Sequence, residues 1–420
     1  MKAKEASYRL ATLTLDDRNL ALDKIALTLS RRSEDILAAN SRDMEAARAG
    51  GLSQVLIKRL KYDRSKLEES LESIRSLQSQ EEVVGRLISR TELDSGLVLD
   101  KVSCPIGVIG VVFEARPEAL VQISCLCLRS GNAVLLKGGT EAKETNEALA
   151  DAIEDALSAD ERLRDAVQLL STREQFRELL KHDDLIDLII PRGSNELVRS
   201  IKESTKIPVL GHAAGICHTY VDKEADMDMA VKVCHDAKVQ YPAVCNAMET
   251  LLVHRSIAKD FLPRMAEDYA RAGVELRGDA SVRQIIDAKE ASDEDWETEY
   301  NDLILSVKMV DSLEEAIAHI NRFSSHHTDA IITSDEASAQ RFMDMVDSSS
   351  VMWNASTRFS DGYRYGLGAE VGISTNKTHA RGPVGLEGLV IYKYKLRGHG
   401  QTVAEYVGKE GRKFTHRKIQ

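Results

Sequence analysis

The sequence contains no long hydrophobic run and no dense cluster of basic residues. No apolar stretch approaches the roughly 18 residues that suggest a membrane span, and the N-terminal segment lacks the apolar core of a secretory signal. Lys and Arg are scattered, and the formal net charge is −11. We therefore expect neither a membrane nor a nucleic acid as a partner.

The cysteines and histidines show no metal-binding pattern. Six scattered cysteines form no CxxC pair and no Cys/His spacing typical of zinc. This usage predicts free thiols in a reducing cytoplasm and no metal. Cys125 and Cys127, two residues apart, are interpreted as facing one side of a strand. For His319, His326 and His327, surface or capping roles are favoured over metal binding.

The two common nucleotide fingerprints are also missing, since neither GxGxxG nor GxxxxGK[ST] occurs. Two predicted strand ends remain of interest. VLLKGGT places Lys137 and two glycines after an apolar strand, and IIPRGSNELV places Gly193 and Ser194 at a strand-to-helix junction. Each is either a phosphate-binding turn or a plain turn with a helix cap.

A chain of 420 residues, 43% hydrophobic and 29% charged, predicts a globular protein of two or three domains. Residues 15 to 80 have a helical pattern, and DSG at 94–96 marks the turn of a hairpin. Strands and helices then alternate, which predicts an α/β fold with largely parallel sheets. A long polar loop that contains aromatic residues follows Val351. A loop of this length is typical of a functional segment.

Cys245 lies in VQYPAVCNAMETLLVH, in a Tyr-Pro turn ahead of an apolar run. Taken alone, this window favours a packed thiol over a nucleophile, because free cysteine is a small, often buried hydrophobe. A thiol on a sharp turn can also attack a carbonyl while backbone N–H groups stabilise the oxyanion. His212 and His218 flank a nearby loop and could line a cleft.

The chain resembles the γ-glutamyl phosphate reductase family, a branch of the aldehyde dehydrogenase superfamily, over nearly its whole length. The motifs that carry the resemblance are PIGVIGVVFEARPEAL, LLKGG, LIIPRGSNELV, YPAVCNAMETLLV, the late loop from NASTRFSDGYRYGLGAEVG onward, and VDSLEEAIAHINRFSSHHTDAII. Phe323 and Ala214 depart from the family pattern, where His or Tyr and an acidic residue are expected.

The resemblance implies roles for particular residues. Cys245 corresponds to the catalytic thiol. Lys137 corresponds to the lysine beside the adenosine ribose, Gly193 and Ser194 to the turn near the pyrophosphate, and Glu299 to the glutamate at the nicotinamide ribose. Superfamily members that prefer NAD carry a Glu where this chain has Thr140, so NADPH is the expected cofactor.

Two superfamily residues have no counterpart. The oxyanion asparagine would fall near Ala115, which leaves the oxyanion to backbone N–H groups, including that of Cys245. The general-base glutamate is replaced by the segment LGHAAG. A reductase of acyl phosphates needs no activated water, so this second absence fits a reductase better than an oxidising dehydrogenase.

The implied fold is aldehyde dehydrogenase-like, with two α/β domains and a small β oligomerisation element. The expected cofactor domain is 1–235, completed by part of 353–390, and the expected catalytic domain is 236–352. The hairpin at about 87–104 and the segment 391–420 are expected to form the oligomerisation element, because pairing with another subunit covers an exposed sheet edge.

The implied reaction is the NADPH-dependent reduction of L-glutamyl 5-phosphate to L-glutamate 5-semialdehyde in proline biosynthesis, through a thioester on Cys245. A homo-oligomer is expected, with glutamate 5-kinase as a possible partner. An oxidising aldehyde dehydrogenase and a non-catalytic interaction protein remain as alternatives. A guanidinium or several hydroxyl and amide donors best hold the substrate α-carboxylate. The candidates are Arg116, Asn354, Ser356, Thr357 and Arg358.

Overall fold

The computed structural model describes residues 1–212 and 214–419. Its first unit is built on a parallel sheet of strand order β5-β4-β3-β6. The six residues of β3 are all buried, as expected for a strand covered by helices on both faces. The strands are β3 (Val108–Phe113), β4 (Ala133–Lys137), β5 (Val167–Leu169) and β6 (Leu188–Arg192).

The first unit contains nine helices within the described part of the chain. They are α1 (Lys2–Leu10), α2 (Leu15–Arg31), α3 (Ser33–Ala49), α4 (Gln54–Leu60), α5 (Arg64–Gln78), α6 (Pro117–Arg129), α7 (Lys143–Leu157), α8 (Arg173–Leu179) and α9 (Asn195–Ser204). The strand interpretation of Cys125 and Cys127 is wrong, because both lie in α6. A short apolar run does not distinguish a buried helix from a strand, and here Pro117 starts a helix.

The second unit has a seven-stranded sheet, order β10-β9-β11-β8-β7-β12-β13, in which every pairing is parallel. Its strands are β7 (Cys217–Val221), β8 (Met248–His254), β9 (Glu275–Gly278), β10 (Lys289–Glu290), β11 (Ile304–Val310), β12 (Thr328–Ile332) and β13 (Ser350–Trp353). Its helices are α10 (Met227–Val239), α11 (Arg255–Arg271), α12 (Leu313–Phe323) and α13 (Glu336–Met345).

The start of this unit differs from the predicted boundary at residue 235. Strand β7 lies between β8 and β12, and α10 packs on α11 and β8. The second unit therefore already includes residues 217–235. Sequence rhythm alone places no boundary here, because β7 follows the same strand-helix alternation as the first unit.

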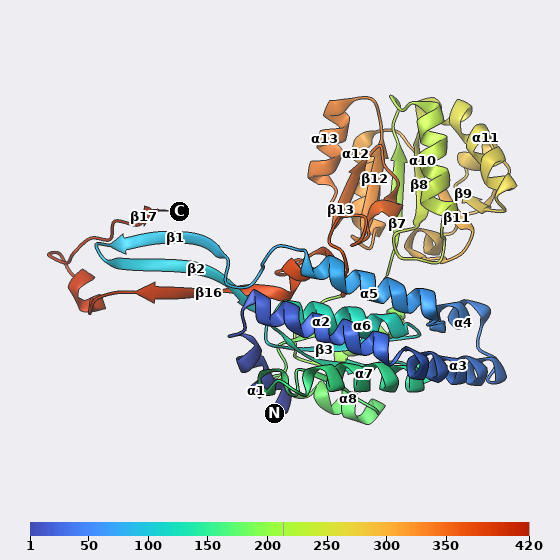
Figure 1. Cartoon of the computed structure of the whole chain (residues 1–420). Coiled ribbons are helices and arrows are strands. Elements are labelled where there is room, and N and C mark those ends of the chain that lie inside the picture. Colours follow the sequence, from blue (N-terminus) through green and yellow to red (C-terminus); the bar gives the residue numbers. More distant parts are fainter. Residues whose placement is uncertain (213, 420) are drawn as a thin grey trace.

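A separate antiparallel sheet projects from the first unit, as Figure 1 shows. It joins β1 (Leu87–Asp94) and β2 (Leu97–Pro105), the predicted hairpin, to β16 (Val390–Arg397) and β17 (Arg417–Lys418). The hairpin turn contains Gly96 at φ +72, a conformation that glycine adopts without strain. The hairpin and the C-terminal strand thus share one sheet, and their role as an oligomerisation element stays a prediction.

The late loop returns to the first unit. Its strands β14 (Gly372–Ser374) and β15 (Gly382–Val384) pair with each other, and Val371, Val384, Leu386 and Leu389 join the core of the first unit. The short 3₁₀ helices are η1 (Thr140–Ala142), η2 (Glu161–Leu163), η3 (Val282–Gln284), η4 (Asp293–Glu297), η5 (Thr357–Phe359), η6 (Leu386–Leu389) and η7 (Val403–Tyr406). Among the described residues, no helix has the length and apolarity to cross a membrane.

Candidate active site

Cys245 lies half-buried in the turn between α10 and β8. The backbone N–H of Ala247 donates to the carbonyl of Val244 (2.9 Å), and the thiol of Cys217 donates to the carbonyl of Cys245 (3.2 Å). Gly215 packs directly on this turn, since a Cβ there would lie 2.3–2.6 Å from the O, Cα and Cβ atoms of Cys245. The close approach of the two segments therefore requires glycine at 215.

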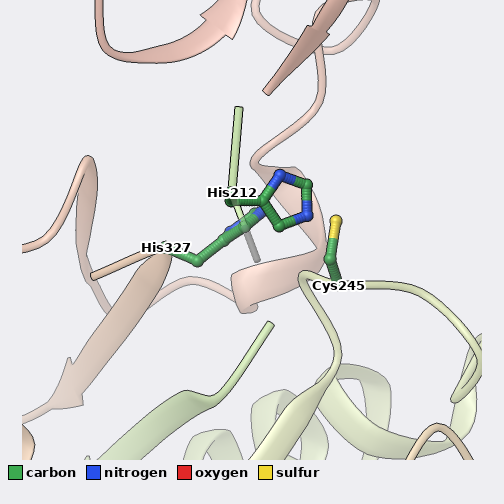
Figure 2. Close-up of side chains that lie close together, drawn as sticks. All are labelled: His212, Cys245 and His327. Carbon is green, nitrogen blue, oxygen red and sulfur yellow. The ribbon is translucent and has the colours of Figure 1, made fainter. Parts of the chain in front are cut away.

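Two imidazoles face the Cys245 thiol. One potential ligand atom from each of His212, Cys245 and His327 lies within 4.8 Å of the other two, and Figure 2 shows the three side chains together. Burial lowers the pKa of His212 below its usual value, so this imidazole is neutral near pH 7. The sequence suggested only that His212 could line a cleft, and it assigned His327 a surface or capping role. The second interpretation is wrong, because His327 is fully buried.

In each of the two histidines, Nδ1 has a hydrogen-bond partner among the described residues. His212 Nδ1 lies 3.1 Å from the carbonyl oxygen of Ile373, which can only accept, so Nδ1 carries the proton and Nε2 has a free lone pair. His327 Nδ1 lies 2.9 Å from the hydroxyl of Thr328. Its Nε2 is buried without a hydrogen-bond partner among the described residues.

Buried polar contacts fix the strand that follows Cys245. Lys238 Nζ donates to Glu249 Oε2 (2.6 Å), and both side chains are almost completely buried, at 0% and 1% exposure. Glu249 Oε1 also accepts from the backbone N–H of Asn301 (3.2 Å). Asn246 Nδ2 donates to the carbonyl of Ser360 (2.8 Å), which ties the cysteine turn to the late loop.

Three predicted cofactor residues, Lys137, Gly193 and Ser194, lie at the carboxyl edge of the first sheet, where ligands bind in parallel α/β sheets. The fourth, Glu299, comes from the second unit, ahead of β11. Ser194 is the N-cap of α9, and its hydroxyl accepts from the backbone N–H of Leu197 (3.4 Å). The Ser194 N–H donates to the carboxylate of Glu114 (3.0 Å), so an anion already sits at this helix start. Asn195 Nδ2 donates to Glu299 Oε2 (2.7 Å). The structure thus brings Gly193, Ser194 and Glu299 together.

Lys137 ends β4 at the same edge and is buried. Its Nζ donates to the carbonyl of Gly138 (2.5 Å), and burial lowers its pKa. One strand, β3, separates it from β6 and Gly193 in the sheet order β4-β3-β6. Ala115, near the expected oxyanion position, has φ +42, and its N–H donates to Glu141 (2.6 Å).

The late-loop candidates occupy different environments. Asn354 is held at both ends of its amide by the backbone of Thr333, accepting from the N–H and donating to the carbonyl at 3.0 Å each. Ser356 caps η5 by accepting from the Arg358 N–H (3.3 Å). The hydroxyl of Thr357 is buried and has no hydrogen-bond partner among the described residues.

Arg358 is buried and its Nε donates to Gln240 (3.0 Å), the residue that follows α10. Burial lowers its pKa. Among the described residues no carboxylate forms a salt bridge with Arg358, and Asp361 pairs with Arg364 instead, at 3.7 Å. The contact with Gln240 holds the Arg358 guanidinium at the end of α10, in the segment that leads to Cys245.

A polar cavity of about 240 Å³ opens beside Arg116 and Arg192. Four acidic side chains line it as well, those of Glu69, Glu118, Asp361 and Glu370. Burial raises the pKa of Glu118 and of Glu370. Glu118 Oε2 is buried with no partner in the described part of the chain. Sequence reasoning identified Arg116 but missed these acidic side chains, because they become neighbours only in the folded chain.

The chain is similar to known proteins over its whole length. The model of the aldehyde dehydrogenase family matches residues 1–293. Curated γ-glutamyl phosphate reductases from Methanosarcina acetivorans and Pelotomaculum thermopropionicum are 54% and 56% identical, each covering 100% of this chain and 96% of the relative. The crystal structure of γ-glutamyl phosphate reductase from Thermotoga maritima superposes with a TM-score of 0.93 at 39% identity, covering 96% of this chain and 98% of that one.

Proposed function

Since this chain belongs to the aldehyde dehydrogenase family, and within it to the γ-glutamyl phosphate reductases, we propose that Cys245 is its nucleophile. The enzyme is an oxidoreductase that reduces L-glutamyl 5-phosphate to L-glutamate 5-semialdehyde in proline biosynthesis. The observation that supports Cys245 most strongly is its half-buried position opposite two imidazoles, one of them neutral.

The first chemical step uses groups within the described cluster. His212 accepts the thiol proton at Nε2, and the Cys245 sulfur attacks the acyl carbon. Phosphate leaves, and a thioester remains on Cys245. A nicotinamide held at the edge of the first sheet would supply the hydride that reduces this thioester. The resulting thiohemiacetal anion on Cys245 then expels the thiolate, and the protonated His212 returns its proton to the sulfur as the aldehyde departs.

The residues at the first sheet edge fit a nicotinamide cofactor. The N-terminus of α9 already attracts the carboxylate of Glu114, which supports binding of a pyrophosphate there once that carboxylate moves aside. Glu299, next to this turn through Asn195, is suited to accept hydrogen bonds from a ribose. Gly193 leaves little space for a side chain, since a Cβ there would lie 2.6 Å from Glu114.

NADPH is the proposed form of the cofactor. Lys137 provides a cation for a 2′-phosphate, and Thr140 starts η1 where a Glu would repel that phosphate. Among the described residues, the Lys137 ammonium donates to the backbone carbonyl of Gly138 and forms no salt bridge, so its charge is available for an anion.

The substrate is proposed to bind between Arg358 and the cavity that contains Arg116. Arg358 contacts Gln240 in the segment that leads to Cys245, and the buried hydroxyl of Thr357 adds a donor for a carboxylate. Glu118 and Glu370 supply acceptors for the α-ammonium group. Ser356 positions η5, and Asn354 positions the turn at Thr333.

The assembly and cellular setting are proposed on separate grounds. Strand β16 exposes Ile391, Tyr392, Tyr394 and Leu396 at 44–59%, which supports its burial in a homo-oligomer. All six cysteines are free, which fits a reducing compartment such as the cytoplasm. Association with glutamate 5-kinase is proposed because an acyl phosphate is short-lived in water.

The reverse reaction distinguishes this function from an oxidising aldehyde dehydrogenase. We expect NADP⁺ reduction with the semialdehyde to require inorganic phosphate, because phosphate must release the acyl group from Cys245. The measurement compares initial rates with and without phosphate and analyses the product. Phosphate-independent formation of glutamate would support the oxidising alternative.

A further inference from the structure

The cluster of His212, Cys245 and His327 has the composition of a metal site. It offers two imidazole nitrogens and one thiol sulfur from three separate segments, within 4.8 Å of one another. Nitrogen and sulfur ligands suit zinc and similar divalent transition metals, whereas magnesium and calcium prefer oxygen. Three protein ligands with a fourth position open to solvent form a common zinc arrangement.

A second observation also indicates a ligand at this place. His327 is fully buried, and its Nε2 has no partner within the described residues. Leaving a buried polar nitrogen unpaired costs about 1–3 kcal/mol. His212 is oriented by the backbone carbonyl of Ile373 through Nδ1, the usual arrangement that directs the lone pair of Nε2 toward a metal.

We propose that this cluster binds Zn²⁺ and that the bound metal reversibly inhibits the enzyme. Typical Zn–N and Zn–S bonds of about 2.0–2.1 and 2.3 Å place tetrahedral ligand atoms roughly 3.3–3.6 Å apart. The present separations, at most 4.8 Å, therefore need to shrink by at most about 1.2–1.5 Å. On binding, the Cys245 thiol releases its proton to solvent and its sulfur bonds to the metal, with no change of oxidation state. The sulfur is then no longer available to attack an acyl phosphate.

The proposal depends on the proposed function only in its claim of inhibition. Metal binding is a property of three side chains, and it is measured without substrate. The inhibitory claim adds that Cys245 is the nucleophile. Two separate readouts therefore keep the two ideas distinguishable.

Binding is tested by titrating Co²⁺ into chelator-treated protein and then displacing it with Zn²⁺. We expect one equivalent of Co²⁺ to give a thiolate-to-metal charge-transfer band, which zinc removes. His212→Ala, His327→Ala and Cys245→Ser should each weaken zinc binding at least about 100-fold, whereas His399→Ala and Cys104→Ser, outside the cluster, should not. Absence of the band, or equal affinity in all five variants, would overturn the site.

Inhibition is tested on the wild-type enzyme alone, so that a folding defect cannot confuse the result. Zinc should slow the alkylation of Cys245, which peptide mass spectrometry maps, and it should abolish turnover. Both effects should be half complete at the same zinc concentration. A chelator should restore both. Zinc that binds and leaves alkylation or turnover unchanged would refute the inhibitory role, as would loss of activity on chelation. Protection without any reductase activity in the metal-free enzyme would contradict the proposed function and leave the metal site intact.

Discussion

The Lys238–Glu249 pair offers a sharp test of how the cysteine turn is supported. Its atoms are 2.6 Å apart, and neither side chain is more than 1% exposed. Removing one partner of such a pair leaves an uncompensated buried charge and costs about 3–5 kcal/mol, whereas removing both with similar shapes is often nearly neutral. We therefore expect Lys238→Met to destabilise the second unit by about 3–5 kcal/mol. The double variant Lys238→Met/Glu249→Gln should recover most of that loss.

The direction of the pH dependence follows from Glu249. Burial raises its pKa to about 7 even with Lys238 present, well above the usual value in an unfolded chain. Between these two pKa values the folded protein binds a proton that the unfolded protein does not. Stability therefore falls as pH rises through this window. Without Lys238 the window extends to higher pH, so acidification should partly rescue the single variant and not the double variant.

Urea unfolding followed by tryptophan fluorescence measures this change. The chain has two tryptophans, Trp296 and Trp353, and both lie in the second unit, so the signal reports on that unit. Lys289→Met is a matched control, since it breaks an exposed pair with Glu275 (2.5 Å, 68% and 30% exposed) and should cost at most about 1 kcal/mol. A single variant as stable as the control would refute the reasoning, and so would a double variant no more stable than the single one.

Three further predictions concern the cofactor, the substrate and pH. Lys137→Ala should weaken NADPH binding about 10- to 100-fold more than NADH binding, because a charge-assisted contact contributes about 1.5–3 kcal/mol. Titration of both cofactors decides this, and an equal loss would assign Lys137 a ribose-only or structural role. Arg358→Ala should lower kcat/KM for the semialdehyde at least about tenfold and spare aldehydes without an α-carboxylate. Asn354→Ala should lower kcat/KM equally for the semialdehyde and for simple aldehydes, because it disturbs the turn at Thr333. If Arg358→Ala also lowered kcat/KM equally for both kinds of aldehyde, the role of Arg358 would be structural. Burial lowers the pKa of His319 to about 3. The unfolded chain therefore binds an extra proton between about pH 6.5 and 3, and stability falls as pH falls through that window. Between pH 7.5 and about pH 5, the free energy of unfolding should fall by about 2 kcal/mol more in the wild type than in His319→Gln, as measured by urea unfolding. The same pH dependence in both proteins would contradict this prediction.

Features encoded by contiguous residues could be predicted from the sequence. The residues DSG predicted the turn between β1 and β2. The position of Ser194 directly after IIPRG predicted a helix cap, and Ser194 is the N-cap of α9. Cys245 stands ahead of an apolar strand, β8, as the pattern suggested. In each case a few neighbouring residues determine the local backbone, so sequence pattern is sufficient.

Features that depend on distant segments could not be predicted. The approach of His212 and His327 to Cys245 requires Gly215 to pack on the cysteine turn and β12 to lie beside β7. Neither histidine has a spacing in the sequence that marks a site. The HHTD motif was recognised only as a family resemblance, and it was the one signal that could have identified His327.

The central claim is that Cys245 carries the acyl group, and it is tested by trapping that intermediate. Glutamyl 5-phosphate, generated in place by a glutamate kinase and ATP, is mixed with the enzyme without nicotinamide cofactor, quenched in acid and analysed by peptide mass spectrometry. We predict a glutamyl adduct on the Cys245 peptide, sensitive to hydroxylamine, which disappears when the reduced cofactor is added. Cys245→Ser should show neither this thioester nor more than about a hundredth of wild-type turnover. An adduct on another residue, or a Cys245→Ser enzyme with near-normal turnover, would contradict the account.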